Sequence, residues 1–317
     1  MDQAAGGEAP GQPRVVAVVV TYNRRDLLLE SLAAVQSQSR PPDSVIVVDN
    51  ASTDGSAAAV RARFPPVQVA ELGANYGGAG GFAYGMALSL TDNADLIWVM
   101  DDDTVPELGA LLALLEARRS HPGRPPALVA SRVIWTDGRA HPMNTPRTKP
   151  FASKAERSAA TACGCIPIRS ASFVSVLVDA AVCRQRGLPH ADYFLWNDDF
   201  EFTTRLLRGN SGLLCPASVA VHKTKTFGAT DVDPGERFFY EVRNKIWTLR
   251  TNSLGPPERV LYGGATVRRW ARTYLKSNDR RALRSAFRRG LASGVRTRPR
   301  PNDQVLPAAG RTARTGP

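Results

Sequence analysis

The sequence predicts an α/β fold built on a Rossmann-like, mostly parallel sheet flanked by helices. Apolar stretches of strand length alternate with helical patterns over the first hundred residues. These strands are nearly unbroken apolar runs, as expected for strands buried on both faces, and several end directly in polar clusters. With 317 residues, 43% of them hydrophobic, the chain is long enough to bury a full core.

Four strands are expected in the first half, with helices between them. The strands are Val15–Val20, Ser44–Val48, Val67–Leu72 and Leu96–Met100. The first helix contains Leu27, Leu28, Leu32 and Val35, the second ends at Arg63, and the third ends near Leu90. Polar clusters follow three strands, at Thr21–Arg24, Asp49-Asn50 and Asp101–Asp103. Ligands bind outside the carboxyl ends of such strands, so we expect a site there.

The second half is less regular. We expect strands at Ala127–Trp135 and Ser172–Val178 with a polar loop (about 144–158) between them, a helix at Asp198–Arg208, and a short strand at Ser218–His222. The predicted organisation is a flexible terminus over 1–13 and one domain over 14–255, in which 14–104 bind nucleotide and 105–255 bind the other substrate. A basic helical extension follows at 256–295 and a disordered tail at 296–317.

The net charge of +12 lies entirely in the C-terminal part. From Pro256 onward there are 15 Lys and Arg against three acids, whereas the first 255 residues are neutral. Two short amphipathic helices are expected, broken at Ser277-Asn278-Asp279, with Trp270 and Tyr274 sharing one apolar face. This segment either lies on an anionic membrane surface or packs its apolar stripes on the domain. No nucleic-acid-binding motif accompanies the charge, so nucleic acid is not expected.

The start of the chain lacks the pattern of a signal peptide, and no apolar run approaches the ~20 residues of a membrane span. We therefore expect a cytoplasmic protein. Cys163, Cys165, Cys183 and Cys215 lack zinc-knuckle spacing. Small buried thiols are the favoured interpretation, with a redox or metal pair at Cys163 and Cys165 as the alternative.

Asp101-Asp102-Asp103 is the sharpest local signal. Adjacent carboxylates repel one another, so a site that holds them close needs a cation. Asp101 and Asp103 point to one side if strand geometry persists, which would suit Mg²⁺ or Mn²⁺. The alternative is an acidic helix cap, because Asp103–Glu107 resembles the start of a helix.

A second acidic cluster lies in Trp196-Asn197-Asp198-Asp199-Phe200-Glu201-Phe202. A carboxylate beside aromatic rings can act as a general base with a pKa raised by burial, or these acids simply begin a helix. His222 closes the last short strand and is either structural or a metal ligand.

The glycine-rich Asn75–Gly81 follows the third strand, not the first. It matches neither a Walker loop nor a dinucleotide fingerprint, which argues against an NTPase and a nicotinamide enzyme. Glycines before a helix suit either close approach of the backbone to a ligand or packing of the helix on the sheet.

Taken in order, VVAVVVTYNRRDLL, VIVVDNASTDGS, the glycine-rich turn, LIWVMDDDT, WNDDFEF and the later histidine resemble the GT-A-fold, inverting family 2 glycosyltransferases. The resemblance covers about Val15 to Arg250. NYGGAGGFAYGM and ERFFYEVRN are most similar to bacterial galactofuranosyltransferases that begin cell-wall galactan on a polyprenyl-linked acceptor, with rhamnosyltransferases as neighbours.

The resemblance implies a role for each matching residue. Thr21, Asn23 and Arg24 would line the uridine-diphosphate pocket, Asp49 would bind uracil, Asn75 would reach the donor, and Trp196 would stack near the sugar. Asp101, Asp103 and His222 would hold Mn²⁺ or Mg²⁺. Asp199 would be the catalytic base, or Asp198 if the register shifts by one. Arg243 and Asn244 lie in a family-like segment to which the sequence assigns no role.

The predicted activity is metal-dependent, inverting transfer of a sugar, with UDP-galactofuranose as donor and a polyprenyl-diphosphate-linked glycan as acceptor. The basic extension would dock the enzyme on the inner face of the plasma membrane. Transfer from dTDP-rhamnose is the alternative within the family. A non-catalytic membrane or nucleic-acid adaptor with a degenerate transferase body is the alternative from another class.

Overall fold

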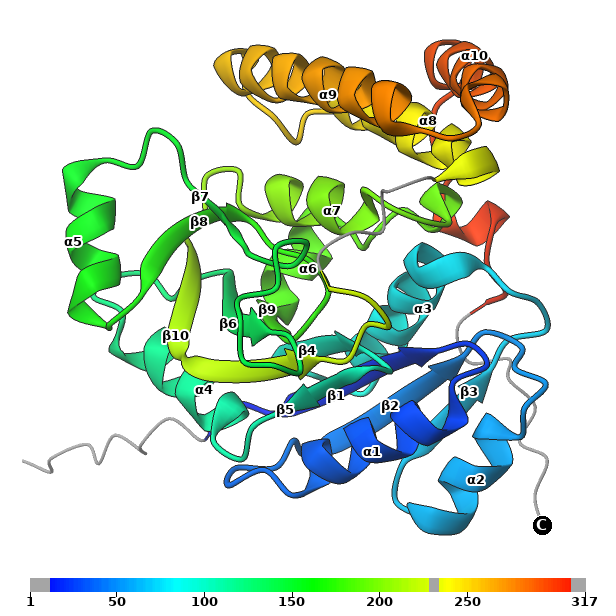
Figure 1. Cartoon of the computed structure of the whole chain (residues 1–317). Helices are drawn as coiled ribbons and strands as arrows, with labels where there is room; N and C mark the ends of the chain where they lie inside the picture. Colours follow the sequence, from blue (N-terminus) through cyan, green and yellow to red (C-terminus); the bar gives the residue numbers. More distant parts are fainter. Residues whose placement is uncertain (1–11, 228–233, 309–317) are drawn as a thin grey trace, which may run out of the picture.

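The computed structural model describes residues 12–227 and 234–308 and contains one mixed sheet (Figure 1). Its strand order is β3-β2-β1-β4-β9-β6-β10-β8-β7, and β5 pairs with β10. The strands are β1 (Val15–Thr21), β2 (Ser44–Asp49), β3 (Gln68–Glu71), β4 (Leu96–Asp101), β5 (Thr104–Pro106), β6 (Leu128–Ile134), β7 (Arg147–Thr148), β8 (Ile166–Ser170), β9 (Val176–Asp179) and β10 (Gly212–His222). Strands β1 to β4 pair in parallel, which confirms the predicted α/β class.

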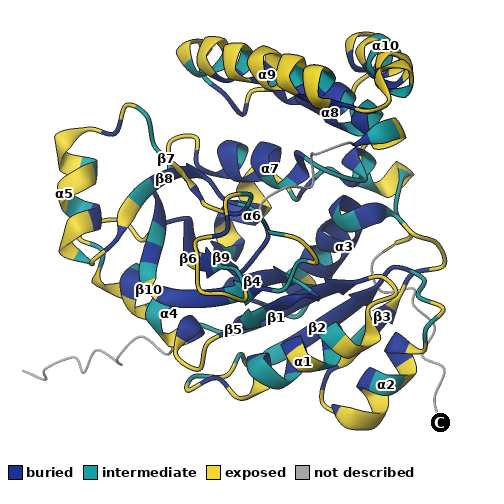
Figure 2. Cartoon of the chain, viewed as in Figure 1, coloured by how far each residue is buried: buried dark blue, intermediate teal, exposed yellow. Residues whose placement is uncertain are grey.

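Helices cover both faces of this sheet, and the side chains of β1 show why. Val16, Val18 and Val20 face one core with α3 (Gly77–Thr91), α6 (Ala180–Arg186) and α7 (Asp198–Leu206). Val15, Ala17 and Val19 face the other core with α1 (Arg25–Gln36), α2 (Ser56–Arg63), α4 (Ala110–Ser120) and α5 (Lys154–Ala162). Successive side chains of a strand point to opposite faces, so a continuous apolar run fills both layers. Figure 2 shows the resulting buried sheet between partly exposed helices.

Because β9 pairs with both β4 and β6, the sheet runs without interruption through both predicted halves. Three details of the second half differ from expectation. Thr104–Pro106 is a strand on β10, not the start of a helix, because its backbone pairs with the long β10. The expected loop holds β7 and the beginning of α5, and only the end of Ser172–Val178 is a strand.

The C-terminal extension is helical, as predicted, and is broken where expected. It consists of α9 (Pro256–Lys276) and α10 (Arg280–Arg296), and α8 (Phe238–Arg250) precedes it. Trp270, Tyr274 and Phe287 pack against Phe238 and Val242 of α8, so these apolar stripes pack on the protein itself. No helix among the described residues is long and apolar enough to cross a membrane.

Residues 297–308 do not form the disordered tail that the composition predicts. Arg300 donates to the Asp192 carboxylate, with its Nη2 2.7 Å from Oδ1. Asn302 accepts from the backbone N–H of Ala191 and donates to the carbonyl of Pro189. These contacts hold the segment against residues 189–192, although it contains few apolar side chains that could be buried. The rest of the predicted tail (309–317) and the predicted flexible start (1–11) lie outside the described residues.

Candidate active site

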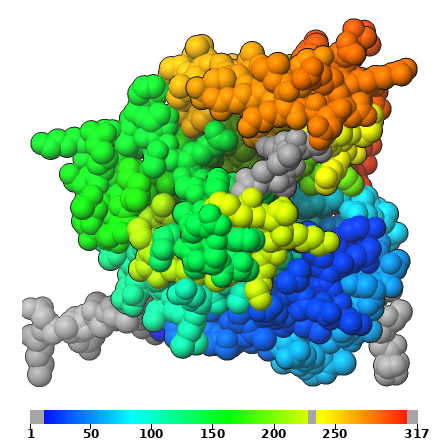
Figure 3. Space-filling model, in the orientation of Figure 1, coloured from blue at the N-terminus to red at the C-terminus, as the bar shows by residue number. Residues whose placement is uncertain are grey.

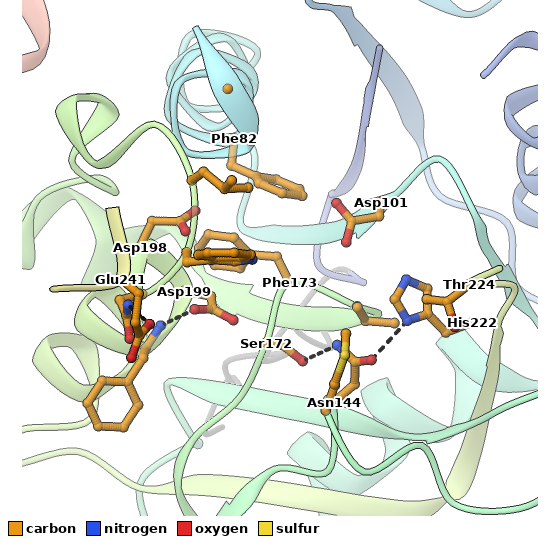
Figure 4. A pocket seen from close by; sticks show the side chains of 18 of the residues that line it. Phe82, Asp101, Asn144, Ser172, Phe173, Asp198, Asp199, His222, Thr224 and Glu241 are labelled. Atoms are coloured by element: carbon orange, nitrogen blue, oxygen red, sulfur yellow. Dashed lines mark hydrogen bonds between the residues drawn. The ribbon is translucent and has the colours of Figure 1, made fainter. Parts of the chain in front are cut away.

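A cavity of about 1520 Å³ opens at the carboxyl ends of β1 and β4 and is lined by residues from both halves and from α9. It collects most of the residues singled out in the sequence. Nine of them line it: Thr21, Arg24, Asn75, Asp101, Asp103, Trp196, Asp198, Asp199 and His222. Figure 4 shows Asp101 and His222 on one side and Asp198 and Asp199 on the other, with Phe82 and Phe173 between them.

Two predicted residues do not line the cavity. Asp49 is buried at the end of β2, where its Oδ1 accepts from the backbone N–H of Ser52. Asn23 has a positive φ and accepts from the backbone N–H of Thr53. Asn23 therefore ties the loop after β1 to the loop after β2, and Asp49 holds the loop after β2.

The three aspartates after β4 have different surroundings. Asp102 is held by the hydroxyl of Thr21 at 2.8 Å and by Arg24 at 3.2 Å, and burial raises its pKa to about 6. Burial and the charges of Asp103 and Asp102 raise the pKa of Asp101 well above its usual range. Burial also raises the pKa of Asp103, but His222 and Arg24 outweigh it and lower that pKa overall. Repulsion among these groups favours a bound cation.

Asp101, Asp103 and His222 each offer a ligand atom, and these atoms lie within 4.8 Å of one another. Asn144 sets the orientation of the imidazole. Its Nδ2 donates to the hydroxyl of Ser172, so its Oδ1 faces His222 Nδ1 at 2.9 Å (Figure 4). Since an amide oxygen only accepts, Nδ1 carries the proton. Nε2 is left facing Asp103 Oδ1 at 2.9 Å.

That arrangement fits a metal ion. A neutral imidazole with its proton on Nδ1 would point the Nε2 lone pair at a carboxylate oxygen. Asp103 Oδ1 is buried against this Nε2 and accepts no hydrogen bond from the other described residues. Either a second proton on His222 or a cation between the two atoms resolves the conflict. A histidine held at its far nitrogen by an outer partner is the usual form of a metal ligand, and carboxylates with imidazole suit divalent ions.

The glycine-rich turn after β3 brings the two sides of the cavity together. Asn50 Nδ2 donates to the Gly77 carbonyl, and Asn75 Oδ1 accepts from the Gly77 N–H. Gly77 has φ +71°, and a Cβ there would lie 2.0 Å from the Phe194 carbonyl oxygen. Only glycine fits this close approach. The turn therefore packs against the backbone just before Trp196, and Asn75 faces the cavity beside it.

The segment before α7 is strained and is held by buried side chains. Phe194, Trp196 and Asn197 all have positive φ, a conformation that costs each non-glycine residue free energy. Asn244, fully buried on α8, donates to the carbonyls of Tyr193, Leu195 and Trp196 at 2.8–2.9 Å. Arg243 donates to the carbonyls of Asp192 and Tyr193. Arg243 and Asn244, to which the sequence assigns no role, thus fix the backbone that carries Trp196 and Asp198.

Asp198 and Asp199 begin α7 and line the cavity. Burial and the neighbouring Asp199 raise the pKa of Asp198 to about 8. Burial also raises the pKa of Asp199, although the charges of Lys245 and Arg147 oppose this. Asp198 in turn helps to raise the pKa of Asp101 across the cavity. Carboxyl groups with raised pKa values in a cavity are suited to general acid–base chemistry.

Solved structures of sugar-transferring enzymes share this fold. TarS 1–349 of S. aureus, in complex with UDP-GlcNAc, matches with a TM-score of 0.60 at 14% identity, over 93% of this chain and 82% of that one. Mannosyltransferase PcManGT from Pyrobaculum calidifontis, in complex with GDP-Man and Mn2+, matches with a TM-score of 0.53 at 20% identity, over 93% and 79%. The architecture is therefore that of the GT-A glycosyltransferases.

Sequence relatives define the family. Galactofuranosyltransferase GlfT1 of Mycolicibacterium smegmatis is 35% identical over 204 residues, which are 63% of this chain and 66% of that protein. The protein of the same name from Mycobacterium tuberculosis is 30% identical over 264 residues, 74% of this chain and 82% of that one. The model described as glycosyl transferase family 2 matches residues 16–173. The chain belongs to glycosyl transferase family 2, which confirms the predicted class of enzyme.

Proposed function

We propose that this glycosyltransferase transfers galactofuranose, with inversion, from UDP-galactofuranose to a polyprenyl-diphosphate-linked glycan in cell-wall polysaccharide synthesis. The observation that carries the proposal is the placement of two raised-pKa carboxyl groups, Asp198 and Asp199, across one cavity from the cluster of Asp101, Asp103 and His222. The choice of sugar and acceptor rests on the relatives named galactofuranosyltransferase.

The donor binds on the side of β1 and β4. Thr21, Arg24, Asn75 and Trp196 all line the cavity and are the proposed contacts of the donor. Asn23 and Asp49 support the nucleotide indirectly, because Asn23 joins the loops after β1 and β2 and Asp49 holds the loop after β2. Asp101, Asp103 and His222 would hold Mn²⁺ or Mg²⁺, which supplies charge neutralisation for a leaving diphosphate.

Asp199 acts as the base. It takes the proton of the acceptor hydroxyl as that oxygen attacks the anomeric carbon, and the bond from that carbon to the diphosphate breaks. Burial raises the pKa of Asp199, which makes the carboxylate a better proton acceptor, whereas the Phe200 N–H and the charges of Lys245 and Arg147 favour the ionised form that a base requires.

The C-terminal extension docks the enzyme on the anionic inner face of the plasma membrane. Val260, Val267 and Leu275 lie along one outward face of α9 and are 78%, 64% and 67% exposed. The arginines of α9 and α10 are mostly exposed beside this face, and such a surface binds anionic lipid. Flotation with phosphatidylglycerol vesicles tests the docking. Replacement of the three apolar residues by serine should abolish flotation, and unchanged flotation would refute it.

Release of nucleoside diphosphate from a donor panel tests the reaction. The assay contains Mn²⁺ or Mg²⁺ and a polyprenyl-diphosphate glycan, with UDP-galactofuranose and dTDP-rhamnose as the decisive donors. Turnover with the first alone supports the proposal. Turnover with dTDP-rhamnose alone would reassign the sugar, and no turnover with any donor beside a verified acceptor would refute the proposed function.

A further inference from the structure

The wall of the cavity formed by α9 is strongly basic. Arg269, Arg272 and Lys276 line the cavity together with Thr273. Their spacing of three, four and seven residues places them on one face of the helix. They extend over about 10 Å at 1.5 Å per residue. Figures 1 and 3 show α9, in orange, lying along the top of the molecule above the green residues of the second half.

This basic face differs from the outward face that carries Val260, Val267 and Leu275. Val267 is nine residues before Lys276, which puts the two half a turn apart, and none of the three apolar residues lines the cavity. The helix thus has one apolar, outward side and one cationic side directed into the active-site cavity. The cations directed into the cavity are placed to meet a substrate.

Among the described residues that line this part of the cavity, cations outnumber acids. Glu241 accepts from Asn197 Nδ2 at 2.7 Å and from Trp270 Nε1 at 3.3 Å, and its Oε2 lies 3.9 Å from Arg269 Nη2. Within residues 12–227 and 234–308, Arg272 and Lys276 have no acid within ion-pair distance. Apart from Arg24, His222 and the three aspartates after β4, the described residues that line the cavity include six cations (Arg147, Arg237, Lys245, Arg269, Arg272 and Lys276) and three acids (Asp198, Asp199 and Glu241).

The positive charge continues inward toward the proposed base. Lys245 Nζ lies 4.5 Å from the centre of the Phe200 ring, and the Arg147 guanidinium lies 5.1 Å from it. Burial lowers the pKa of Lys245 to about 8, with Glu241 opposing this shift and the cations of Arg147 and Arg269 adding to it. An anion entering here would relieve repulsion among these groups.

We propose that Arg272 and Lys276 on the inner face of α9 bind a phosphate or diphosphate group on the acceptor substrate. The donor diphosphate is expected at the opposite wall, beside Asp101, Asp103 and His222, so the basic face is left for the acceptor. Arg and Lys on successive turns of a helix are spaced to grip neighbouring phosphate oxygens. This inference deepens the proposed function, because it names the group by which the acceptor is held.

Two acceptors that differ only in the phosphate test the assignment. One carries the glycan on a short, water-soluble prenyl diphosphate, and the other carries the same glycan on an uncharged alkyl group. The variants are Arg272→Gln with Lys276→Gln, and Arg268→Gln as the matched control, because Arg268 is exposed on α9 and does not line the cavity. No vesicles are present, so docking on lipid cannot contribute.

The double variant should raise KM for the diphosphate acceptor at least about tenfold, as expected for loss of charged hydrogen bonds. KM for the alkyl acceptor and for the donor should change less than about twofold, and Arg268→Gln should match wild type with both acceptors. Equal losses with both acceptors, a raised donor KM, or an equal effect of Arg268→Gln would overturn the assignment.

A binding measurement keeps this assignment separate from the proposed reaction. If wild type transfers sugar to neither acceptor, the proposed function fails, and calorimetry with inorganic diphosphate in EDTA still tests the basic face. Without metal, the acidic wall repels diphosphate. Wild type and Arg268→Gln should bind it and the double variant should bind at least about tenfold more weakly. Absence of binding to wild type, or equal binding by all three, would refute the site.

Discussion

The two walls of the cavity carry opposite charge. Asp101, Asp102 and Asp103 stand at the end of β4 with Arg24 as the cation among them, whereas Arg272 and Lys276 of α9 line the other wall. A diphosphate approaching the first wall meets carboxylates and needs a metal ion, but one approaching the second wall meets cations directly. If the acceptor carries a phosphate group, as proposed, this difference in charge would direct donor and acceptor to different walls.

The walls also differ in how their backbone is fixed. Asp101 ends a strand that pairs in parallel with β1, so ordinary sheet geometry positions it. Asp198 and Asp199 follow three residues of positive φ, and buried side chains of α8 hold that backbone. The donor wall should therefore tolerate the loss of a single contact better than the opposite wall does.

Asp199→Asn should have the largest effect on catalysis. Loss of the base is expected to lower kcat by about 10²–10⁴-fold, with the dissociation constant of the donor nearly unchanged. Sugar transfer and donor titration, measured side by side, check both halves of this expectation. Asp198→Asn is the matched control and should cost less. If Asp198→Asn lowers kcat more than Asp199→Asn does, Asp198 is the base. If Asp199→Asn abolishes donor binding, the wall that carries Asp199 also contributes to the donor site.

Asn244→Ala tests the buried clamp. The change leaves the carbonyls of Leu195 and Trp196 without their side-chain donor, whereas the Tyr193 carbonyl keeps its bond from Arg243. The free energy of unfolding should fall by about 2–4 kcal/mol, since each buried unsatisfied group costs about 1–3 kcal/mol. kcat should fall at temperatures where the variant is still folded. Urea denaturation and steady-state kinetics measure the two effects.

Asn210→Ala is the control for that experiment, because Asn210 makes one comparable bond, to the Leu206 carbonyl, at the end of α7. It should cost about 1 kcal/mol and leave kcat unchanged. Equal effects of the two variants on kcat would remove the clamp from the account of the active site.

Local sequence patterns point to residues of both walls but not to the buried side chains that hold those residues in place, for a physical reason. Val15–Val20 and Asp101-Asp102-Asp103 are local patterns in which a strand and the residues after it suffice. Asn144 and Asn244 act on partners 78 and 48–51 residues away, so the sequence around them does not show what they hold, even though Asn244 lies in a family-like segment. The sequence shows the basic residues of α9 only as positive charge, and the fold shows which of them line the cavity.

The donor wall is probed through Asn144→Ala. Removal of the amide frees Nδ1 of His222 and lets the imidazole change tautomer. Affinity for Mn²⁺ should fall by about 10–100-fold, the usual effect of removing an outer partner of a metal ligand. Calorimetric titration with Mn²⁺ measures it. Thr145→Ala, on a neighbouring residue of the same loop, is the control, and equal affinities in wild type and Asn144→Ala would remove His222 from the metal site.

Asp198 should make the metal-free protein less stable as pH rises. Its pKa is raised from 3.8 to about 8, so between these values the folded state holds a proton that the unfolded state has lost. The stability this gives is complete below pH 3.8 and is lost as pH rises through about 8, by at most about 1.4 kcal/mol per pH unit. Thermal unfolding in EDTA from pH 5 to 8 should show a falling Tm that Asp198→Asn flattens. A variant as steep as wild type would contradict the raised pKa.

The smallest expected effect belongs to Arg300→Ala. Arg300 pairs with Asp192 just before the strained segment, but its side chain is 60% exposed, and exposed ion pairs contribute at most about 1 kcal/mol. The free energy of unfolding should therefore fall by less than about 1 kcal/mol. Asn302→Ala breaks two bonds to the backbone of Ala191 and Pro189 and should cost more. If Arg300→Ala instead lowers kcat as much as Asn244→Ala does, the exposed Arg300–Asp192 pair contributes, together with Asn244, to the geometry of the segment that carries Asp198 and Asp199.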